Sequence, residues 1–497
     1  MIWVRKRGIE KILAVFWILV QGVCVTYPFR ANTPAMAGEA ITEEGSGQAQ
    51  RADPPQKDEF LNLMIYGFAD AGISINPAQP YNGINFGQLY TDQANIPQLN
   101  QTFLTIERPF LRNSDEFDYQ IKIQTLYGSD ARFHHVLGET EYLLPGKYQL
   151  ALVEAYAQAH FPAAFQNGFD LRIGQFISYN AGVENVPSID NLFYTRSYIY
   201  NAGPAQHVGI NSISHINDVI NLYLGIDSGT NTSIGWPGDN NAAAAVQGGV
   251  EFNLPDQSLT IAAFTHAGPE NPKQTDPYNV GWPNIPTECG CDPNTTWRYY
   301  NNLTISYTLN DYLRFITDIA YYRDDGWNTL SLSGLSENQI YIFDSLINTQ
   351  FSALPQRARG VSAFGIAQYA SFTIDKMLTL NGRIEFWRDA NNFFTVSYPR
   401  PFSSANQSHG FPADVISQPF FSNNPSRGTS YLATTIGTTF RMPLGSSGAV
   451  KELIIRPEAR IDIALNNAAP FIGSNTQEGL RTQKTFSIDA LIPFELK

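Results

Sequence analysis

Histidine residues are the side chains of this chain best suited to catalysis or metal binding, and seven occur in 497 residues. His134 and His135 are adjacent, and Glu139 and Glu141 follow them. Imidazole and carboxylate groups can hold a metal ion, but we expect this pair to be solvated loop residues. Asp130 lies close enough in sequence to leave an Asp–His protease arrangement open.

Acyl-transfer chemistry finds no support in the sequence. The Gly-x-Ser-x-Gly elbow is absent. No His-x-Ser pair occurs either, which a barrel-type lipase would need on one strand face. The sequence therefore predicts that the chain is not an enzyme and needs no cofactor or metal.

Cysteine offers one further possibility, in the segment Cys289-Gly290-Cys291. Two thiols are too few for a structural zinc site, which needs four ligands. An oxidising compartment would favour a local disulfide between Cys289 and Cys291, although so short a ring is strained. Both redox states remain open.

Composition limits the classes of function. Charged residues make up 15% of the chain, against about 25% in average soluble proteins. Aromatic residues make up 13%, and the net charge is −13. An acidic chain of this kind is not expected to bind nucleic acid, and its apolar content excludes disorder throughout.

The N-terminus has the order of a secretory signal peptide. Basic residues up to Lys11 precede the apolar run 12–20, and Ala35-Met36-Ala37 forms a small-x-small cleavage site. We expect residues 1–37 to be the signal peptide, with an uncleaved anchor as the alternative. Residues 38–60 are polar and predict a flexible periplasmic linker.

From residue 61 onward, apolar and polar residues alternate with period two, which is typical of β-strands. Phe117, Tyr119 and Ile121 share one face of a strand, and Asp118 and Lys122 the other. Helical spacing is nowhere sustained. The pattern predicts sixteen strands: 61–75, 99–110, 116–128, 148–161, 168–178, 204–214, 218–228, 244–253, 258–267, 297–308, 312–323, 358–371, 376–388, 430–442, 450–465 and 481–495.

The connections between these strands are alternately short and long. Short periplasmic turns and long external loops are typical of transmembrane β-barrels in the bacterial outer membrane. Strands in a bilayer must close into a barrel to satisfy their backbone hydrogen bonds. We therefore predict an all-β, antiparallel up-and-down barrel over residues 61–497, with a secreted soluble β protein as the alternative.

Several motifs along this region resemble those of the outer-membrane porins called OmpL-like or porin type 2. The resembling stretches are Tyr66–Gly72, Tyr127–Arg132, Arg172–Phe176, Phe193–Tyr200, Pro204–Ile210 and His266–Asn271. The resemblance implies a porin-like channel in the outer membrane of a Gram-negative bacterium. It does not name a solute.

The polar strand faces would line the channel and set its field. The expected inward acidic residues are Asp70, Glu107, Asp118, Glu154, Asp170, Asp318, Glu385, Glu452, Glu458, Asp462 and Asp489. The expected inward basic residues are Lys122, Arg172, Arg314, Arg383, Arg456 and Arg460. The acidic excess favours weak cation preference or indifference, unless the charges simply pair along the wall.

The third long connection, residues 179–203, is unusually apolar for a loop exposed to water. In general porins the third loop folds into the barrel and narrows it. By analogy Glu184, Asp190, Tyr194 and Arg196 would line a constriction, with aromatic residues stacking on sugars. The alternative is that the segment packs against the inner wall as a plug.

The sequence as a whole predicts a porin for passive diffusion of small hydrophilic solutes and ions. Outer-membrane lipid and lipopolysaccharide are its expected surroundings, and a homotrimer is plausible by analogy. Two alternatives remain: a specific channel for sugars or organic acids, and a plugged-barrel surface adhesin or receptor.

Overall fold

The structure is a computed structural model, and it describes most of the chain after residue 62. The described ranges are 63–110, 116–140, 143–144, 146–235, 241–270, 294–326, 360–395, 428–445, 448–466, 468–475 and 479–496. The expected signal peptide, the expected linker and the Cys289–Cys291 pair lie outside these ranges.

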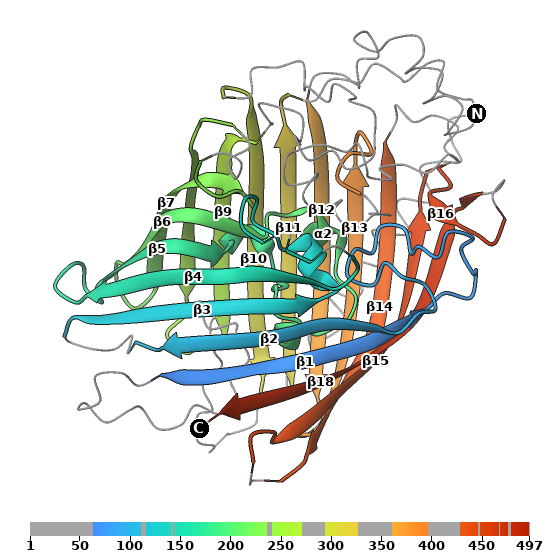
Figure 1. Ribbon diagram of the computed structural model, residues 1–497, viewed down its shortest axis with the longest axis horizontal. Helices are drawn as coiled ribbons and strands as arrows, with labels where there is room; N and C mark the ends of the chain where they lie inside the picture. The colour runs from blue at the N-terminus through green and yellow to red at the C-terminus, as the bar shows by residue number, and fades with distance from the viewer. Residues whose placement is uncertain are drawn as a thin grey trace, which may run out of the picture. The chain divides into compact units, whose positions relative to one another are not determined.

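Sixteen antiparallel strands close into one barrel, in which each strand pairs with its sequence neighbours and β1 pairs with β18 (Figure 1). The barrel strands are β1 (Met64–Ile75), β2 (Gln98–Arg108), β3 (Asp118–Gly128), β4 (Gln149–Phe161), β5 (Phe169–Ile177), β6 (Gln206–His215), β7 (Ile220–Thr230), β8 (Ala245–Asn253), β9 (Leu259–Pro269), β10 (Trp297–Asn310), β11 (Leu313–Asp324), β12 (Val361–Thr373), β13 (Leu378–Asp389), β14 (Thr429–Pro443), β15 (Glu452–Ala464) and β18 (Thr482–Leu496). The predicted fold class and strand count are confirmed.

The remaining described elements are short and lie in the connections. They are the 3-10 helices η1 (Asp130–Phe133), η2 (Tyr179–Ala181) and η3 (Ser188–Asp190), the helix α2 (Tyr198–Ala202), and the small hairpin of β16 (Phe471–Ile472) and β17 (Gly479–Leu480). No helix among the described residues is long and apolar enough to cross a membrane.

Short and long connections alternate around the barrel, as the sequence predicts. The turns 216–219, 311–312 and 374–377 lie at the end of the barrel where both termini of the sheet meet. At that end Ile65 pairs with Leu496. The long connections lie at the opposite end, so this topology fits short periplasmic turns and external loops.

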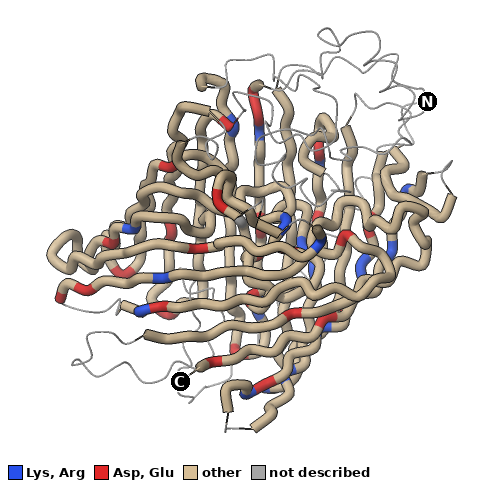
Figure 2. The backbone as a smooth tube through the Cα atoms, viewed as in Figure 1, with Lys and Arg blue, Asp and Glu red and all other residues tan. Residues whose placement is uncertain are grey.

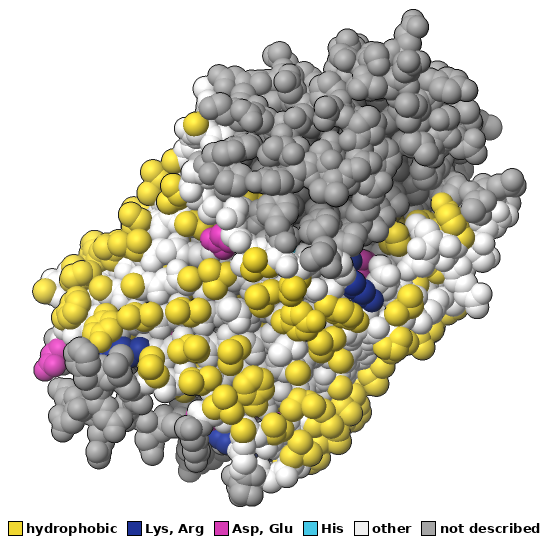
Figure 3. All heavy atoms as spheres, viewed as in Figure 1, with side chains coloured by type: hydrophobic (Ala, Val, Ile, Leu, Met, Phe, Trp, Pro, Cys, Tyr) yellow, Lys and Arg dark blue, Asp and Glu magenta, His cyan; other side chains and the backbone are white. Residues whose placement is uncertain are grey.

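The outer face of the barrel is apolar because alternate side chains of each strand point outward. In β3, Ile121 and Ile123 are exposed, whereas Lys122 and Gln124 between them are buried. Figure 3 shows hydrophobic side chains covering the visible outer face, with few charged ones among them. A surface of this kind is stable in lipid rather than in water.

The aromatic residues near strand ends divide between the two faces. Tyr127, Phe161 and Tyr321 are exposed, as expected for an interfacial belt. Tyr322 and Trp387 are fully buried inside the barrel, so they do not belong to that belt. Both side chains point inward because of their spacing along the strand. Tyr322 lies on the same strand face as the inward residue Asp318, and Trp387 lies on the same face as the inward residue Glu385.

The barrel interior contains segments of the first three long connections. From the first, residues 76–97, Gln88 donates to Asp462 of β15 (Nε2–Oδ2 3.0 Å). From the second, Asp130 accepts hydrogen bonds from Asn100 and Gln101 of β2. The third connection, residues 179–203, is described below. These segments form the apolar core with residues such as Phe86, Phe193 and Tyr198.

Candidate functional site

The loop of residues 179–203, here the third loop, is fixed to the inner wall through its backbone. Glu458 of β15 accepts hydrogen bonds from the amides of Tyr194 (2.8 Å) and Thr195 (3.2 Å). Glu385 of β13 accepts from the amides of Tyr198 and Ile199, both at 3.0 Å. Charged acceptors make strong hydrogen bonds to backbone amides, so these carboxylates hold the loop in one position.

Three arginines of the same wall bind the carbonyl groups of the third loop. Arg383 of β13 donates to the carbonyl of Thr195 (3.0 Å) and pairs with Glu184. Arg456 of β15 donates to the carbonyl of Ser188 (2.8 Å), and Arg460 to that of Arg196. Because each backbone polar group needs a partner when buried, this wall replaces the water that an irregular loop would otherwise require.

The charges of this wall are also paired with one another. Arg456 forms a bidentate pair with Asp489 of β18 (Nε–Oδ1 3.1 Å), and Arg460 pairs with Asp462 (2.7 Å). Acidic and basic positions are accordingly interspersed along the barrel strands (Figure 2). The excess of inward acidic residues therefore does not form an open acidic surface along this wall.

The predicted pore-lining residues on β3 and β5 lie on a different part of the wall from the β13 and β15 residues that hold the third loop. Lys122 pairs with Glu154 (2.6 Å), and Asp118 with Arg108 (2.9 Å). Arg172 donates to Gln158 (Nε–Oε1 2.8 Å) and lies 4.2 Å from the ring centre of Tyr156. Arg172 also donates to the hydroxyl of Tyr179 at the start of the third loop (3.5 Å).

The four loop candidates occupy different positions. Glu184 is buried and accepts from Arg383 and from the amide and hydroxyl of Ser197. Tyr194 is buried and donates to Asn100 of β2 (2.8 Å). Asp190 is only half-buried and accepts from Asn185 within the loop. These three residues stabilise the conformation of the loop through hydrogen bonds. The environment of Arg196 is different.

Arg196 is the loop cation without an ion-pair partner in the described structure. Its side chain is 3% exposed, and its Nε and Nη1 atoms have no hydrogen-bond partner. The guanidinium lies between the rings of Tyr90 and Tyr200, 5.3 and 5.4 Å from their centres. Aromatic faces hold a cation without neutralising it, and the Nε and Nη1 atoms of Arg196 are buried rather than exposed to the lumen.

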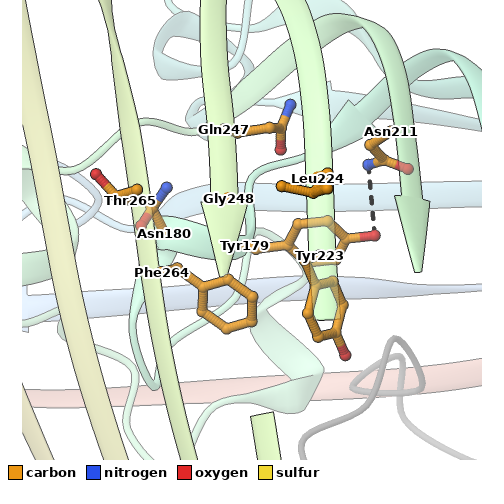
Figure 4. A pocket seen from close by; sticks show the side chains of 9 residues that line it. All are labelled: Tyr179, Asn180, Asn211, Tyr223, Leu224, Gln247, Gly248, Phe264 and Thr265. Carbon is orange, nitrogen blue, oxygen red and sulfur yellow. Dashed lines mark hydrogen bonds between the residues drawn. The ribbon is translucent and has the colours of Figure 1, made fainter. Parts of the chain in front are cut away.

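The aromatic residues of the third loop are packed rather than offered to solutes. Phe193, Tyr194, Tyr198 and Tyr200 are all buried. A hollow beside the start of the loop is lined by Tyr179, Asn180, Asn211, Tyr223, Leu224, Gln247, Gly248, Phe264 and Thr265 (Figure 4). It has no room for a water molecule. This packing favours the wall-docked alternative over sugar stacking at these rings.

His134 and His135 are buried, so the expectation that they are solvated is wrong. His135 contacts Gln149 (2.6 Å), and the ring nitrogens of His134 make no hydrogen bond with any residue that the structure describes. Burial lowers the pKa of His134 to about 3 and that of His135 to about 4. Burial raises the pKa of Asp130 to about 6.

These shifts predict that acid weakens the folded state of residues 129–137. An unfolded histidine has a pKa near 6.5 and protonates first, so the stability contributed by the neutral histidines is lost as pH falls from about 6.5 toward 4. Protonation of Asp130 below pH 6 has the opposite effect and favours the folded state. The two histidines together outweigh this single carboxyl group. We expect denaturant unfolding to show a stability loss of a few kcal/mol between pH 7 and about pH 4. His134→Asn should reduce that pH dependence, and an unchanged dependence would contradict it.

The parts of this site that depend on strand register could not be predicted from the sequence. Glu385 and Glu458 were expected on the inner wall, but their role as anchors for loop amides has no sequence signal. The inward residues Asp227, Glu251, Arg298, Asp324 and Asp389 were also missed. Their alternation with outward neighbours such as Ile226 and Val250 could have identified Asp227 and Glu251.

Comparison with known proteins gave one family. The sequence profile of the family described as "Putative beta-barrel porin-2, OmpL-like" matches residues 62–494. Curated proteins gave no match.

Solved structures similar to this chain are bacterial outer-membrane proteins. The channel DcaP of Acinetobacter baumannii has 10% identity and a TM-score of 0.45, covering 87% of this chain and 97% of its own. OmpT of Vibrio cholerae has 8% identity and a TM-score of 0.44, covering 87% and 97%. An anion-selective porin from Comamonas acidovorans has 8% identity and a TM-score of 0.42, covering 87% and 99%.

Proposed function

This chain belongs to the OmpL-like beta-barrel porin-2 family, and we propose that the third loop narrows its channel beside Arg196. The chain is an outer-membrane porin for the passive diffusion of small hydrophilic solutes. The finer assignment is that Glu184, Asp190, Tyr194 and Arg196, together with the wall residues Arg383, Arg456 and Arg460, define the narrow region.

One observation carries this proposal: the wall binds the backbone of the third loop through both its carboxylates and its arginines. Side-chain contacts alone would tolerate a moving loop. Here Glu385 and Glu458 accept four loop amides, and Arg383 and Arg456 donate to loop carbonyls. A segment held in this way restricts the lumen permanently, so size exclusion should not depend on a bound ligand.

A specific channel for organic acids is the second candidate, and the free donors of Arg196 favour it. Neither Nε nor Nη1 has a hydrogen-bond partner in the described structure, and because both atoms are buried, a carboxylate solute would accept hydrogen bonds from them only after Arg196 turned toward the lumen. Such a channel would show saturable block by organic acids, whereas general diffusion would not. The plugged-barrel receptor would show no conductance.

Charge removal at Arg196 tests the narrow region directly. Arg196→Gln should shift the reversal potential in a salt gradient toward cation selectivity, because it removes a positive charge that forms no ion pair in the described structure. Arg196→Glu should shift it further. Arg323→Gln is the matched control, since Arg323 is half-exposed and pairs with Asp325. Equal reversal potentials for the wild type and both Arg196 variants would exclude Arg196 from the path.

The surroundings of the barrel complete the proposal. The signal peptide of residues 1–37 would direct export, and residues 38–60 would remain in the periplasm. The apolar outer face would contact lipid, with lipopolysaccharide at the external end. One solved structure of Vibrio cholerae OmpT is described as a trimer form, and a homotrimer is proposed here as well.

A further inference from the structure

A buried cluster of two histidines and one aspartate lies on the inner wall, apart from the third loop's four predicted residues. His207 of β6, Asp227 of β7 and His266 of β9 are 0%, 4% and 0% exposed. Each offers one ligand atom, and these three atoms lie within 4.8 Å of one another. We propose that His207, Asp227 and His266 bind a divalent transition-metal ion at the external end of the barrel wall.

The distances within the cluster suit a single ion. Asp227 Oδ1 lies 3.0 Å from His266 Nε2 and 3.4 Å from His207 Nδ1. Ligand atoms about 2.0–2.1 Å from a tetrahedral ion stand about 3.3 Å apart. One oxygen of Asp227 therefore already faces both imidazoles at the separation that coordination requires.

Two of the three ligands also have a hydrogen-bond partner that would orient them. His207 Nε2 lies 2.9 Å from the hydroxyl of Ser178, and Gln247 donates to the second oxygen of Asp227 (2.8 Å). His266 Nδ1 makes no hydrogen bond in the described structure and faces Glu270 Oε1 at 3.8 Å. Metal-bound histidines use their second ring nitrogen for a hydrogen bond, as His207 does with Ser178. His207 Nδ1, Asp227 Oδ1 and His266 Nε2 remain as the ligand atoms, within 4.8 Å of one another. Asp227 Oδ1 also accepts from the amide of Gly229 (2.8 Å), and His207 Nδ1 lies 3.3 Å from the carbonyl oxygen of Gly229.

Local backbone features bring the three strands together at this point. The β6–β7 register shifts between His207 and Gly209, which marks a bulge. A Cβ at Gly209 would lie 2.2 Å from the carbonyl oxygen of Ile226, so only glycine allows β6 to approach here. The small Ala245 of β8 lies between Asp227 and β9, which lets His266 reach across it.

The charge and donor set favour a transition metal over calcium or magnesium. Two imidazoles and one carboxylate suit zinc, copper, nickel or iron, whereas calcium and magnesium prefer oxygen ligands. Arg298, the nearby cation, pairs with Asp324 (2.7 Å). The carboxylate of Asp227, which faces both imidazoles, would attract a cation. A bound ion would crosslink β6, β7 and β9 where the third loop returns to the barrel.

Cobalt binding to the purified, untagged protein tests the proposal. After chelator treatment, the wild type in detergent should bind one equivalent of Co²⁺, seen by visible d–d absorption, and Zn²⁺ should displace it. Asp227→Asn and His266→Gln should each weaken binding at least about tenfold, since even outer-shell partners contribute that much. Zn²⁺ should also raise the unfolding temperature of the wild type but not of Asp227→Asn.

The matched control is His160→Gln, because His160 contacts Asp170 (2.6 Å) in another buried His–Asp cluster. In that cluster His215 meets the other oxygen of Asp170, so the ligand atoms do not converge. This variant should bind Co²⁺ as the wild type does. The absence of a saturable cobalt band in heat-modifiable, folded protein would overturn the proposal. Equal binding by Asp227→Asn, His266→Gln and the wild type would also overturn it.

Discussion

Replacing residues 179–204 with an Asn-Gly turn is expected to raise single-channel conductance several-fold. A two-residue turn can connect β5 to β6 here, because Ile177 pairs with Gln206 and the amide of Ser178 donates to the carbonyl of Ala205 (3.0 Å). Asn-Gly forms the two-residue turns that connect antiparallel strands. The replacement removes the segment that lies against β13 and β15 inside the barrel, so the lumen becomes wider.

Planar-bilayer recordings with polyethylene glycols of graded size measure this widening. The variant should admit larger polymers than the wild type, and both proteins should migrate as heat-modifiable barrels. Glu385→Ala with Glu458→Ala is the companion variant, because it keeps the loop but removes acceptors of four of its amides. Its conductance should be noisy and lie between that of the wild type and that of the loop-replacement variant. Equal conductance and equal polymer cut-off in all three proteins would show that the third loop does not narrow the channel.

Replacing Arg456 with alanine is expected to cost about 3–5 kcal/mol of folding free energy, the usual cost of breaking a buried ion pair. The substitution leaves the carboxylate of Asp489 buried beside that of Asp70, without its guanidinium partner. It also removes the donor to the carbonyl of Ser188. Denaturant unfolding in lipid vesicles measures the loss.

Two variants separate this effect from a general effect of removing arginine. Arg323→Ala breaks the exposed pair with Asp325 and should cost no more than about 1 kcal/mol. Adding Asp489→Asn to Arg456→Ala should restore part of the stability, because it removes the uncompensated charge. A cost for Arg456→Ala no larger than that for Arg323→Ala would contradict the anchoring role of the wall.

The fold could be predicted closely because lipid and lumen impose opposite polarity on successive residues. The predicted strand 116–128 is β3 at Asp118–Gly128, and the predicted strand 481–495 is β18 at Thr482–Leu496. Alternation also places Lys122 and Arg383 on the inner face without any knowledge of tertiary contacts. Local pattern was sufficient for these features because each strand meets the same two environments.

The site could not be predicted to the same depth, because its contacts join residues far apart in sequence. Glu458 and Tyr194 meet only after the barrel closes and the loop enters it. The approach of His207 to Asp227 depends on a bulge and on the register of β6 and β7. Alternation gives the face of a residue but not its neighbours around the ring. The burial of His134 likewise depends on a connection that turns inward.

Single-channel conductance of the purified wild-type protein in a planar bilayer is the most direct test of the central claim that this barrel is a porin with a narrow channel. We predict stable, ohmic conductance steps, and a channel that admits small polymers and excludes larger ones. Sugars and organic acids added at increasing concentration would distinguish general diffusion from a specific channel through saturable block. A folded, heat-modifiable barrel without conductance would contradict the claim and make a plugged surface receptor the better account.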